Sequence, residues 1–320
     1  MYDNNMKILI VSGFLGAGKT TFIKELIKRT RENIVVMENE MGDTTLDSQA
    51  ISSVGGAEVY DFMEGCVCCN MKDSFATSLL AVENTLSPDY VVVEPTGAAM
   101  LGNIIENVRK ICYERISLLP PIAIVTPHSF AANMTEFGGV LRDQISNAET
   151  IVFSKLDRAD AAETADVADK IRRMNKSAKI ISEPYGTQSD KWWHSLLSDE
   201  KRDENRGFTA GRHSELDELE ELSYRRIYFR SEADLILFAN DALYGRLGDV
   251  VRIKGVVRAG TEWVSVNLAD SVYEISGAPE GVDVSQCVII GKKLDKCAVE
   301  RHFVVIPELK PRKGYGLADF

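Results

Sequence analysis

The chain lacks long apolar stretches. No run of hydrophobic residues among its 320 residues approaches the roughly 18 that a membrane-spanning helix requires. The short run Ile8–Val11 follows a single early lysine, Lys7, and is typical of a strand and not of a signal-peptide core. We therefore expect no membrane partner and a cytoplasmic location.

Positive charge is also in short supply. The chain carries 37 Lys and Arg against 48 Asp and Glu, which gives a net charge of -11. A general nucleic-acid binder needs a basic surface, so nucleic acid is not an expected partner. The hydrophobic content of 45% is ordinary for a globular protein and is enough for a sizeable core.

Cysteine and histidine are few, at six and four residues. Six cysteines in a chain of this length do not make a disulfide framework. Three of them crowd together, whereas Cys112, Cys287 and Cys297 lie apart and are expected to be small core residues. In a reducing compartment, the crowded set indicates metal binding or redox chemistry.

Hydrophobic patterns divide the chain into two domains. In residues 1–197, buried strands such as Lys7–Val11 and Tyr90–Val93 alternate with helical stretches such as Lys19–Thr30. Strands without a polar face are typical of a parallel sheet covered by helices on both sides. This rhythm predicts an α/β domain with a doubly wound, mostly parallel sheet.

A change in composition follows this first domain. Residues 198–221 are polar and acidic, which predicts an exposed linker. From residue 222 to residue 320, short strand patterns surround one clear helical stretch, Asp234–Tyr244. We expect this part to form a second, smaller α+β domain.

The most informative motif is the segment from Gly13 to Thr20, which fits G-x-x-x-x-G-K-T and lies between a strand and a helix. Its glycines let successive backbone N–H groups face the phosphates of a nucleotide, and the start of the helix favours the same negative charge. Lys19 supplies a positive charge, and Thr20 supplies an oxygen to Mg²⁺. The expected nucleotide-binding residues here are Gly13, Gly16, Ala17, Gly18, Lys19, Thr20 and Thr21.

A second motif, Glu94-Pro-Thr-Gly97, ends a buried strand. In a P-loop NTPase, an acid at this place helps to hold Mg²⁺ or its water, and a nearby glycine N–H senses the γ-phosphate. Glu94 is therefore a magnesium and catalytic candidate beside Lys19 and Thr20. Gly97 is a further nucleotide-binding candidate.

A third motif, Ser154-Lys155-Leu-Asp157, also follows a strand. The carboxylate of Asp157 can accept hydrogen bonds from the two donors on one edge of guanine, and the stem of Lys155 can cover the ring. Adenine lacks this donor pair, so the motif indicates GTP as the nucleotide. Ser154 stands where Asn is usual and can still supply one hydrogen bond.

The fourth motif is Gly65-Cys66-Val-Cys68-Cys69. Three thiolates so close in sequence can converge on one ion at about 2.3 Å each, which suits Zn²⁺ and also Co²⁺. Two other interpretations stay open. Cys66 and Cys69 have the spacing of a redox pair, and all three thiols can also be buried and inert.

These motifs, in this order, resemble the CobW family of the CobW/UreG/HypB class of P-loop GTPases. The resemblance extends over Glu38–Asp47 and, in the second domain, over Arg252–Gly255 and Val288–Gly291. It implies a GTPase that binds a transition metal and delivers it to a client metalloprotein. It also implies Asp47 as a weaker magnesium candidate and Glu40 as a metal ligand beside Cys66, Cys68 and Cys69.

Two features depart from the family. Many relatives carry a His-rich stretch, whereas the four histidines here are isolated in the sequence. Thr126-Pro127 stands where relatives commonly show an Asp-containing turn, which leaves the client and the metal open. Nucleotide-dependent dimers occur among related GTPases, so a homodimer of this kind is a further alternative.

The leading hypothesis is that GTP and Mg²⁺ assemble a tight metal site and that hydrolysis releases the metal to the client. One alternative is a GTPase that activates a metal- or corrinoid-dependent enzyme without carrying the ion. Others are a small-molecule kinase and a metal sensor without turnover. The motif at Ser154–Asp157 argues against the kinase.

Overall fold

The computed structural model describes residues 5–38, 57–61, 72–112, 115–198, 219–279 and 281–306. They belong to two compact units, the first of which reaches Glu221 and the second of which begins at Leu222, except that Ala269–Ser271 group with the first unit. Each unit is considered by itself below. The predicted linker, residues 198–221, lies almost entirely outside the described residues.

The first unit is built on one sheet whose paired strands run parallel. In spatial order these strands are β3 (Ala57–Asp61), β2 (Ile34–Glu38), β4 (Tyr90–Glu94), β1 (Met6–Gly13), β6 (Ile122–Val125), β7 (Thr150–Phe153) and β8 (Lys179–Ile181). Because the strands are parallel, all their carboxyl ends lie at one edge of the sheet. That edge is where ligands bind in open α/β sheets.

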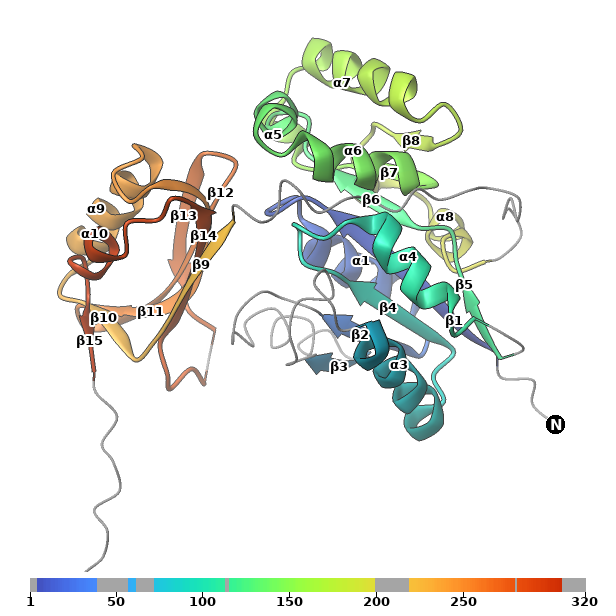
Figure 1. The fold of residues 1–320 in the computed structure, drawn as a ribbon, viewed down its shortest axis with the longest axis horizontal. Coiled ribbons are helices and arrows are strands. Elements are labelled where there is room, and N and C mark those ends of the chain that lie inside the picture. The colour runs from blue at the N-terminus through green and yellow to red at the C-terminus, as the bar shows by residue number, and fades with distance from the viewer. Residues whose placement is uncertain are drawn as a thin grey trace, which may run out of the picture. The chain divides into compact units, whose positions relative to one another are not determined.

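Helices cover both faces of this sheet (Figure 1). They are α1 (Lys19–Thr30), α3 (Lys72–Leu86), α4 (Leu101–Arg109), α5 (Phe130–Glu136), α6 (Gly138–Asn147), α7 (Ala161–Met174) and α8 (Asp190–Ser195). Two short 3-10 turns, η1 (Leu156–Arg158) and η2 (Tyr185–Thr187), follow β7 and β8.

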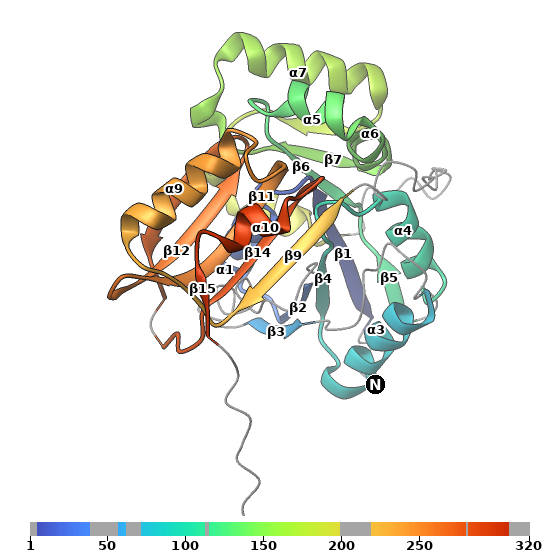
Figure 2. The ribbon, with the colours of Figure 1, turned by 60° about the vertical axis from the view of Figure 1, so that its left-hand side comes forward.

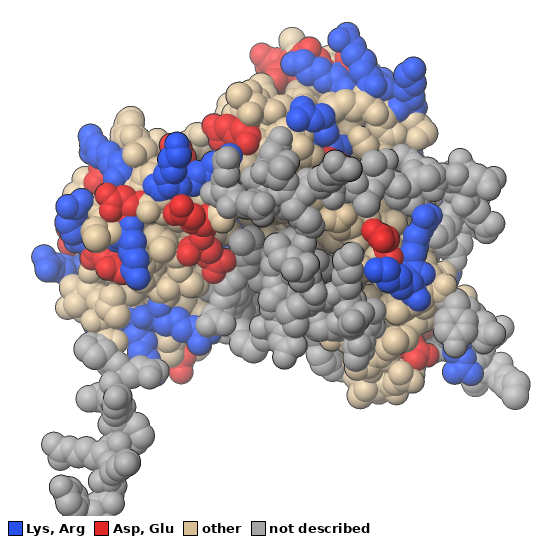
Figure 3. Space-filling view, in the orientation of Figure 1, with Lys and Arg blue, Asp and Glu red and all other residues tan. Residues whose placement is uncertain are grey.

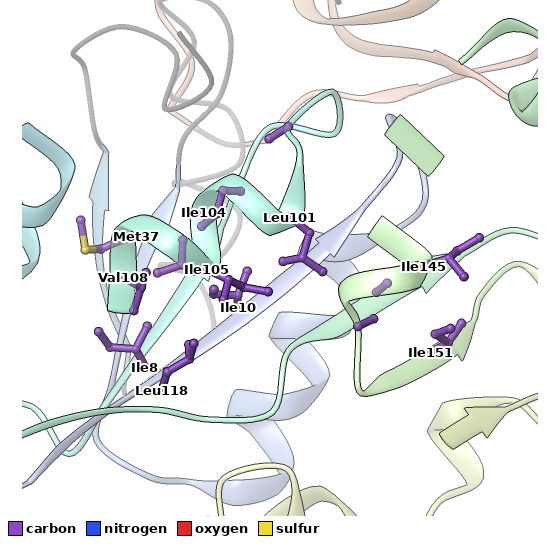
Figure 4. Close-up of a cluster of buried hydrophobic side chains, with 14 of the residues drawn as sticks. Ile8, Ile10, Met37, Leu101, Ile104, Ile105, Val108, Leu118, Ile145 and Ile151 are labelled. Atoms are coloured by element: carbon purple, nitrogen blue, oxygen red, sulfur yellow. The ribbon is translucent and has the colours of Figure 1, made fainter. Parts of the chain in front are cut away.

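Side chains of the central strand β1 alternate between the two cores. Ile8 and Ile10 point to the face covered by α4, where they meet Ile104 and Ile105 (Figure 4). Leu9 and Val11 belong to the opposite core, together with residues of α1 and α8. Such alternation has a period of two, as strand geometry requires. The strand patterns in the sequence are apolar on both faces for this reason.

A proline pair interrupts the sheet beside β1. The strand β5 (Ile116–Leu118) pairs with Met6–Ile8, and β6 pairs with the last residues of β1. Pro120 and Pro121 stand between β5 and β6 and have no backbone N–H to donate to the ladder. The strand therefore breaks into two pieces, of which the sequence patterns predict only β6.

The second unit contains a sheet with helices against one face (Figure 2). Its strands are β9 (Glu220–Arg225), β10 (Ile227–Phe229), β11 (Asp249–Ala259), β12 (Glu262–Ala269), β13 (Val272–Gly277), β14 (Gln286–Lys292) and β15 (Val304–Val305). The order is β13-β12-β11-β10-β15, and β14 pairs with both β11 and β9. Leu235 and Phe238 of α9 (Glu232–Leu243) and Val299 of α10 (Lys296–Glu300) share one buried cluster with the strands.

These observations confirm the predicted fold class, a doubly wound parallel α/β sheet followed by a smaller α+β domain. None of the helices in the described part of the chain is long and apolar enough to cross a membrane. Among the described residues that are visible in Figure 3, basic and acidic side chains are interspersed.

Candidate nucleotide and metal site

The loop from Gly13 to Thr20 joins the carboxyl end of β1 to the start of α1. Gly13, Gly16 and Gly18 have φ angles of 150°, 73° and 93°, which side chains rarely tolerate. A Cβ at Gly13 would also lie 2.5 Å from the carbonyl oxygen of Ile124. The glycines are therefore required by the course of the backbone, as the motif predicts.

Lys19 lies inside this loop. Its side chain is buried, and Nζ donates a hydrogen bond to the carbonyl oxygen of Gly13 at 3.2 Å. Gly18 precedes α1 in a left-handed conformation and, as a glycine, has no side chain to cap the helix. The first N–H groups of a helix need partners from outside it, and phosphate oxygens are suitable ones. The loop thus presents an ammonium group and a helix N-terminus together.

Thr20 and Glu94 meet at the edge of the sheet. The hydroxyl of Thr20 donates to Oε1 of Glu94 at 2.9 Å, although 74 positions separate the two residues. Glu94 is buried at the end of β4. Hydroxyl and carboxylate oxygens are the ligands that Mg²⁺ prefers, so this donor pair fits magnesium. The sequence predicts both residues, and the structure brings them together.

A second buried carboxylate, Glu38, stands beside Glu94. Glu38 ends β2, and its Cα is paired with that of Glu94 across the two strands. Ile34, Val36 and Val92 point to the core under α1, so strand alternation puts both glutamates on the α1 face of the sheet. The sequence motifs do not select Glu38 as a site residue. The only indication in the sequence was its position at the end of a buried strand.

The turn that follows Glu94 packs directly on the phosphate loop. A Cβ on Gly97 would lie 2.4 Å from the backbone nitrogen of Leu15 and 2.6 Å from its Cα. No L-residue with a side chain fits there without displacing the phosphate loop. The structure therefore puts Gly97 beside the loop, in the place expected of a residue that senses the γ-phosphate.

The loop after β7 is tied to the phosphate loop by Ser154. The Oγ of Ser154 donates to the carbonyl oxygen of Ala17 at 2.6 Å and lies 3.3 Å from the hydroxyl of Thr126. A serine has one proton to donate, so Thr126 donates to Ser154. Both residues are buried. The serine hydroxyl thus bonds to the phosphate loop.

Lys155 and Asp157 follow at the same edge. Lys155 has a left-handed backbone with φ 51° and directly precedes the 3-10 turn η1, in which Asp157 is exposed. An exposed carboxylate can accept hydrogen bonds from a base. Thr21 is likewise exposed on the first turn of α1.

An aromatic cluster packs against α1 through Phe22. Phe22 contacts the rings of Tyr185, Trp192 and Trp193, with ring centroids 5.3, 6.4 and 5.1 Å away. Burial raises the pKa of Tyr185 above its usual value. Phe22 therefore packs the helix that begins at the phosphate loop against η2 and α8.

The remaining predicted ligands lie outside the described residues. These are Glu40, Asp47, Cys66, Cys68 and Cys69. Among the residues that the structure does describe, no three His, Cys, Asp or Glu side chains gather as a metal site. The described histidines each lie beside one acid, with Nδ1 or Nε2 within 4.0 Å of Glu163, Glu32 or Asp241.

Comparison with known families agrees with this geometry. The family described as "CobW/HypB/UreG, nucleotide-binding domain" matches residues 7–182, which is more than half of the chain. The chain belongs to the CobW family of P-loop GTPases. The "Cobalamin synthesis protein cobW C-terminal domain" matches residues 220–305 of this CobW-family member. The predicted family resemblance is confirmed.

Curated relatives are about a quarter identical to the chain over the regions that align. Zinc chaperone YjiA of Escherichia coli is 28% identical over 191 residues, which cover 57% of this chain and 59% of YjiA. Zinc chaperone CobW of a Sinorhizobium species is 26% identical over 293 residues, covering 77% of this chain and 79% of that protein. The chain thus matches less than two thirds of the length of YjiA.

A solved structure is similar over nearly the whole chain. The crystal structure of Zn(II)-bound YjiA GTPase from E. coli covers 93% of this chain and 97% of its own, at 20% identity and a TM-score of 0.46.

Proposed function

We propose that this CobW-family protein is a GTP-hydrolysing metallochaperone. It binds a transition metal of the zinc or cobalt class at Cys66, Cys68 and Cys69 and delivers the metal to a client metalloprotein in a nucleotide-dependent way. The family assignment and the names of the zinc chaperones YjiA and CobW support this proposal. A cytoplasmic location is part of it, because thiolates stay reduced there.

The nucleotide part of the proposal rests on three loops at one edge of the sheet. Backbone N–H groups of Gly13–Thr20 and the ammonium group of Lys19 bind the phosphates. Thr20 and Glu94 hold Mg²⁺, which neutralises charge on the β- and γ-phosphates. Glu94, whose carboxylate accepts from the Thr20 hydroxyl at 2.9 Å, also assists in positioning the attacking water.

Selectivity for guanine is assigned to the loop after β7. The exposed carboxylate of Asp157 accepts from the two guanine donors, and the stem of Lys155 covers the ring. Ser154 acts indirectly, because its hydroxyl is used on the carbonyl of Ala17.

The metal part of the proposal follows from chain topology. In the sequence, Cys66 follows Asp61, the last residue of β3, by five positions. β3 lies beside β2, and β2 lies beside β4, with about 5 Å between neighbouring strands. β3 therefore ends at the same edge of the sheet as the Thr20–Glu94 pair, and the closeness of Cys66 to β3 in the sequence supports the proposal.

The observation that carries the proposal is the alignment of Glu38 with Glu94. Glu94 contacts the magnesium candidate Thr20, while Glu38 leads after two residues to Glu40. Each of two neighbouring buried carboxylates has a higher affinity for protons or cations than it would have alone. We propose that Glu38 joins the transition-metal site and connects it to the magnesium site.

The experiment is a competitive Zn²⁺ and Co²⁺ titration of the pure protein, with Mg²⁺ and either a non-hydrolysable GTP analogue or GDP. We expect tighter metal binding with the GTP analogue. Replacing Cys66, Cys68 and Cys69 by serine removes this binding, and Glu38→Gln weakens it. Equal affinities in the two nucleotide states contradict the coupling. Client activation that survives the triple serine variant instead supports the GTPase chaperone that carries no metal.

A further inference from the structure

A buried amide on α6 holds the turn that follows Glu94. Gln144 is 1% exposed, and its Nε2 donates to the carbonyl oxygens of Gly97 at 3.0 Å and Ala99 at 3.1 Å. Both protons of the amide are therefore used on this one turn. Between 45 and 47 positions separate Gln144 from these acceptors in the chain.

The turn is held on its other side by the phosphate loop. The N–H of Ala99 closes the turn by donating to the carbonyl of Thr96 at 2.9 Å. The Cα of Gly97 leaves no room for a side chain against Leu15. Thr96–Ala99 is thus clamped between the backbone of the phosphate loop and the side chain of Gln144.

The preceding residue of α6 holds the next segment of the chain. Oδ2 of Asp143 accepts from the backbone N–H of Gly102 at 3.1 Å, in the first turn of α4. Asn147 in turn donates to Oδ1 of Asp143 at 3.0 Å. First-turn N–H groups have no partner within their own helix, so this contact fixes the start of α4. α6 therefore sets the position of the whole segment between β4 and α4.

Packing alone does not explain an amide at this position. Oε1 of Gln144 is buried, and no donor among the described residues reaches it. An acceptor left without a partner is unfavourable, so an apolar side chain of similar length would fill the space at lower cost. An apolar residue, however, cannot donate hydrogen bonds to the carbonyls of Gly97 and Ala99.

We propose that Gln144 is a positioning residue of the GTPase cycle, which fixes the Thr96–Ala99 turn so that the N–H of Gly97 faces the γ-phosphate. This inference rests on the proposed nucleotide site. Gln144 acts through the turn and touches neither nucleotide nor magnesium. Loss of its two hydrogen bonds weakens binding of GTP more than binding of GDP, because only GTP has the γ-phosphate.

The test compares Gln144→Met with the wild-type full chain. Methionine keeps the length and packing of the side chain and removes both donors. We expect the ratio of affinities for a GTP analogue and GDP to fall at least about fivefold, with a similar fall in kcat, because two hydrogen bonds to one turn are lost. The measurements are calorimetric titration of both nucleotides and a phosphate-release assay for kcat and KM.

Asn175→Leu is the matched control. Asn175 is another buried amide, and its Nδ2 donates to the carbonyls of Ile145 at 2.7 Å and Ala148 at 2.9 Å, at the carboxyl end of α6 and not in the Thr96–Ala99 turn. We expect this variant to lower Tm and leave the affinity ratio unchanged. A second variant, Gln144→Glu, keeps the shape of the side chain and has one donor only when it is protonated. Its ratio of affinities for the GTP analogue and GDP should therefore recover in part as the pH is lowered from about 8 to about 6.

Two outcomes overturn the inference in different ways. If Gln144→Met lowers Tm as Asn175→Leu does and keeps the wild-type affinity ratio and kcat, Gln144 is a packing residue. If the wild-type protein neither prefers the GTP analogue over GDP nor releases phosphate, the proposed function fails together with the inference.

Discussion

The hydroxyl of Ser154 donates a hydrogen bond to the carbonyl oxygen of Ala17 at 2.6 Å and so joins the loop after β7 to the phosphate loop. Thr126 donates to the same hydroxyl from the loop after β6. At both positions the resemblance leads us to expect other side chains, an Asn in place of Ser154 and an Asp-containing turn at Thr126. In the fold the two residues are neighbours and form one chain of hydrogen bonds.

We expect this chain of hydrogen bonds to behave as a unit. Ser154→Ala leaves the buried carbonyl of Ala17 without this donor, which costs about 1–3 kcal/mol and weakens nucleotide binding about tenfold or more. Thr126→Val alone costs less, because Ser154 still reaches Ala17. In a double-mutant cycle, the loss caused by Thr126→Val should shrink once Ser154 is alanine. Nucleotide titration and thermal denaturation of the four proteins measure this coupling.

Ser285→Ala serves as the control for this cycle. Ser285 is a buried serine of the second unit that donates to the carbonyl of Ile227 at 2.5 Å. The variant should lose stability without a change in nucleotide affinity. If the losses of affinity and stability caused by Ser154→Ala and Thr126→Val are strictly additive, the two residues do not act as one chain of hydrogen bonds.

The Thr20–Glu94 pair should determine the magnesium requirement. Thr20→Val removes a ligand oxygen at nearly constant volume, and Glu94→Gln removes the negative charge. For each variant we expect the Mg²⁺ concentration at half-maximal phosphate release to rise and kcat to fall about tenfold or more, because magnesium stabilises charge in the transition state. A magnesium titration of GTP hydrolysis is the measurement.

Thr30→Val on the same helix is the matched control. The Thr30 hydroxyl donates to the carbonyl of Leu26 at 2.8 Å, at the far end of α1. This variant should keep the wild-type magnesium curve. A wild-type curve for Thr20→Val as well would show that the magnesium ligand is elsewhere.

The close contact of Gly97 with the phosphate loop predicts a strong effect of one methyl group. In Gly97→Ala, the new Cβ would meet the backbone of Leu15, which cannot rotate away, so the loop must shift. Overpacking of this kind costs about 1–3 kcal/mol. We expect affinity for both GTP and GDP to fall about tenfold, because the phosphate loop serves both nucleotides.

Gly186→Ala tests the specificity of that effect. A Cβ at Gly186, in the first unit, would meet no atom within 4 Å. Its nucleotide affinities should equal those of the wild type. The Gly97 argument is wrong if the two alanine variants bind nucleotide equally well.

His302 makes the stability of the second unit depend on pH. Burial lowers the pKa of His302, and its Nε2 lies 3.3 Å from Asp241. The folded state therefore prefers the neutral imidazole, while the unfolded chain takes up a proton as the pH falls below about 6.5. The stability is complete above that pH and decreases as the pH falls from it to the lower pKa of the folded state.

Calorimetry of the intact chain between about pH 8 and about pH 5 measures this dependence. His302→Gln keeps a donor toward Asp241 and does not titrate, so the decrease should become smaller. His128→Gln, a half-exposed histidine of the first unit, controls for the loss of one histidine. If the stability of His302→Gln falls with pH as much as that of the wild type, other groups are responsible for the decrease.

Local patterns in the sequence were sufficient for some of this site. The glycines of the phosphate loop, Lys19, Thr20 and Glu94 each stand next to a strand or a helix boundary, and the roles that we propose for them follow from that local setting. The parallel sheet was predictable for the same reason, since strands such as β4 have no polar face. The second domain was predictable from the change of pattern after residue 221, where short strands surround one helical stretch.

Other features depend on contacts between distant segments. Glu38 becomes notable only when the pairing of β2 with β4 puts it beside Glu94. Gln144 lies on an amphipathic helix, where its burial and its two acceptors are set by the turn at Gly97. The use of the Ser154 hydroxyl depends on the distance to Ala17 in the fold. Strand register and packing determine these partners, and motif spacing does not encode them.

The aromatic cluster under α1 gives the protein a built-in optical probe. Of its three tryptophans, Trp192 and Trp193 pack against Phe22 on the helix that begins at the phosphate loop, whereas Trp263 lies in β12 of the second unit. Two of the three tryptophans therefore contact a side chain that stands two positions after Thr20 in the sequence. We expect emission from Trp192 and Trp193 to change on nucleotide exchange, so that exchange can be followed in real time without any attached label.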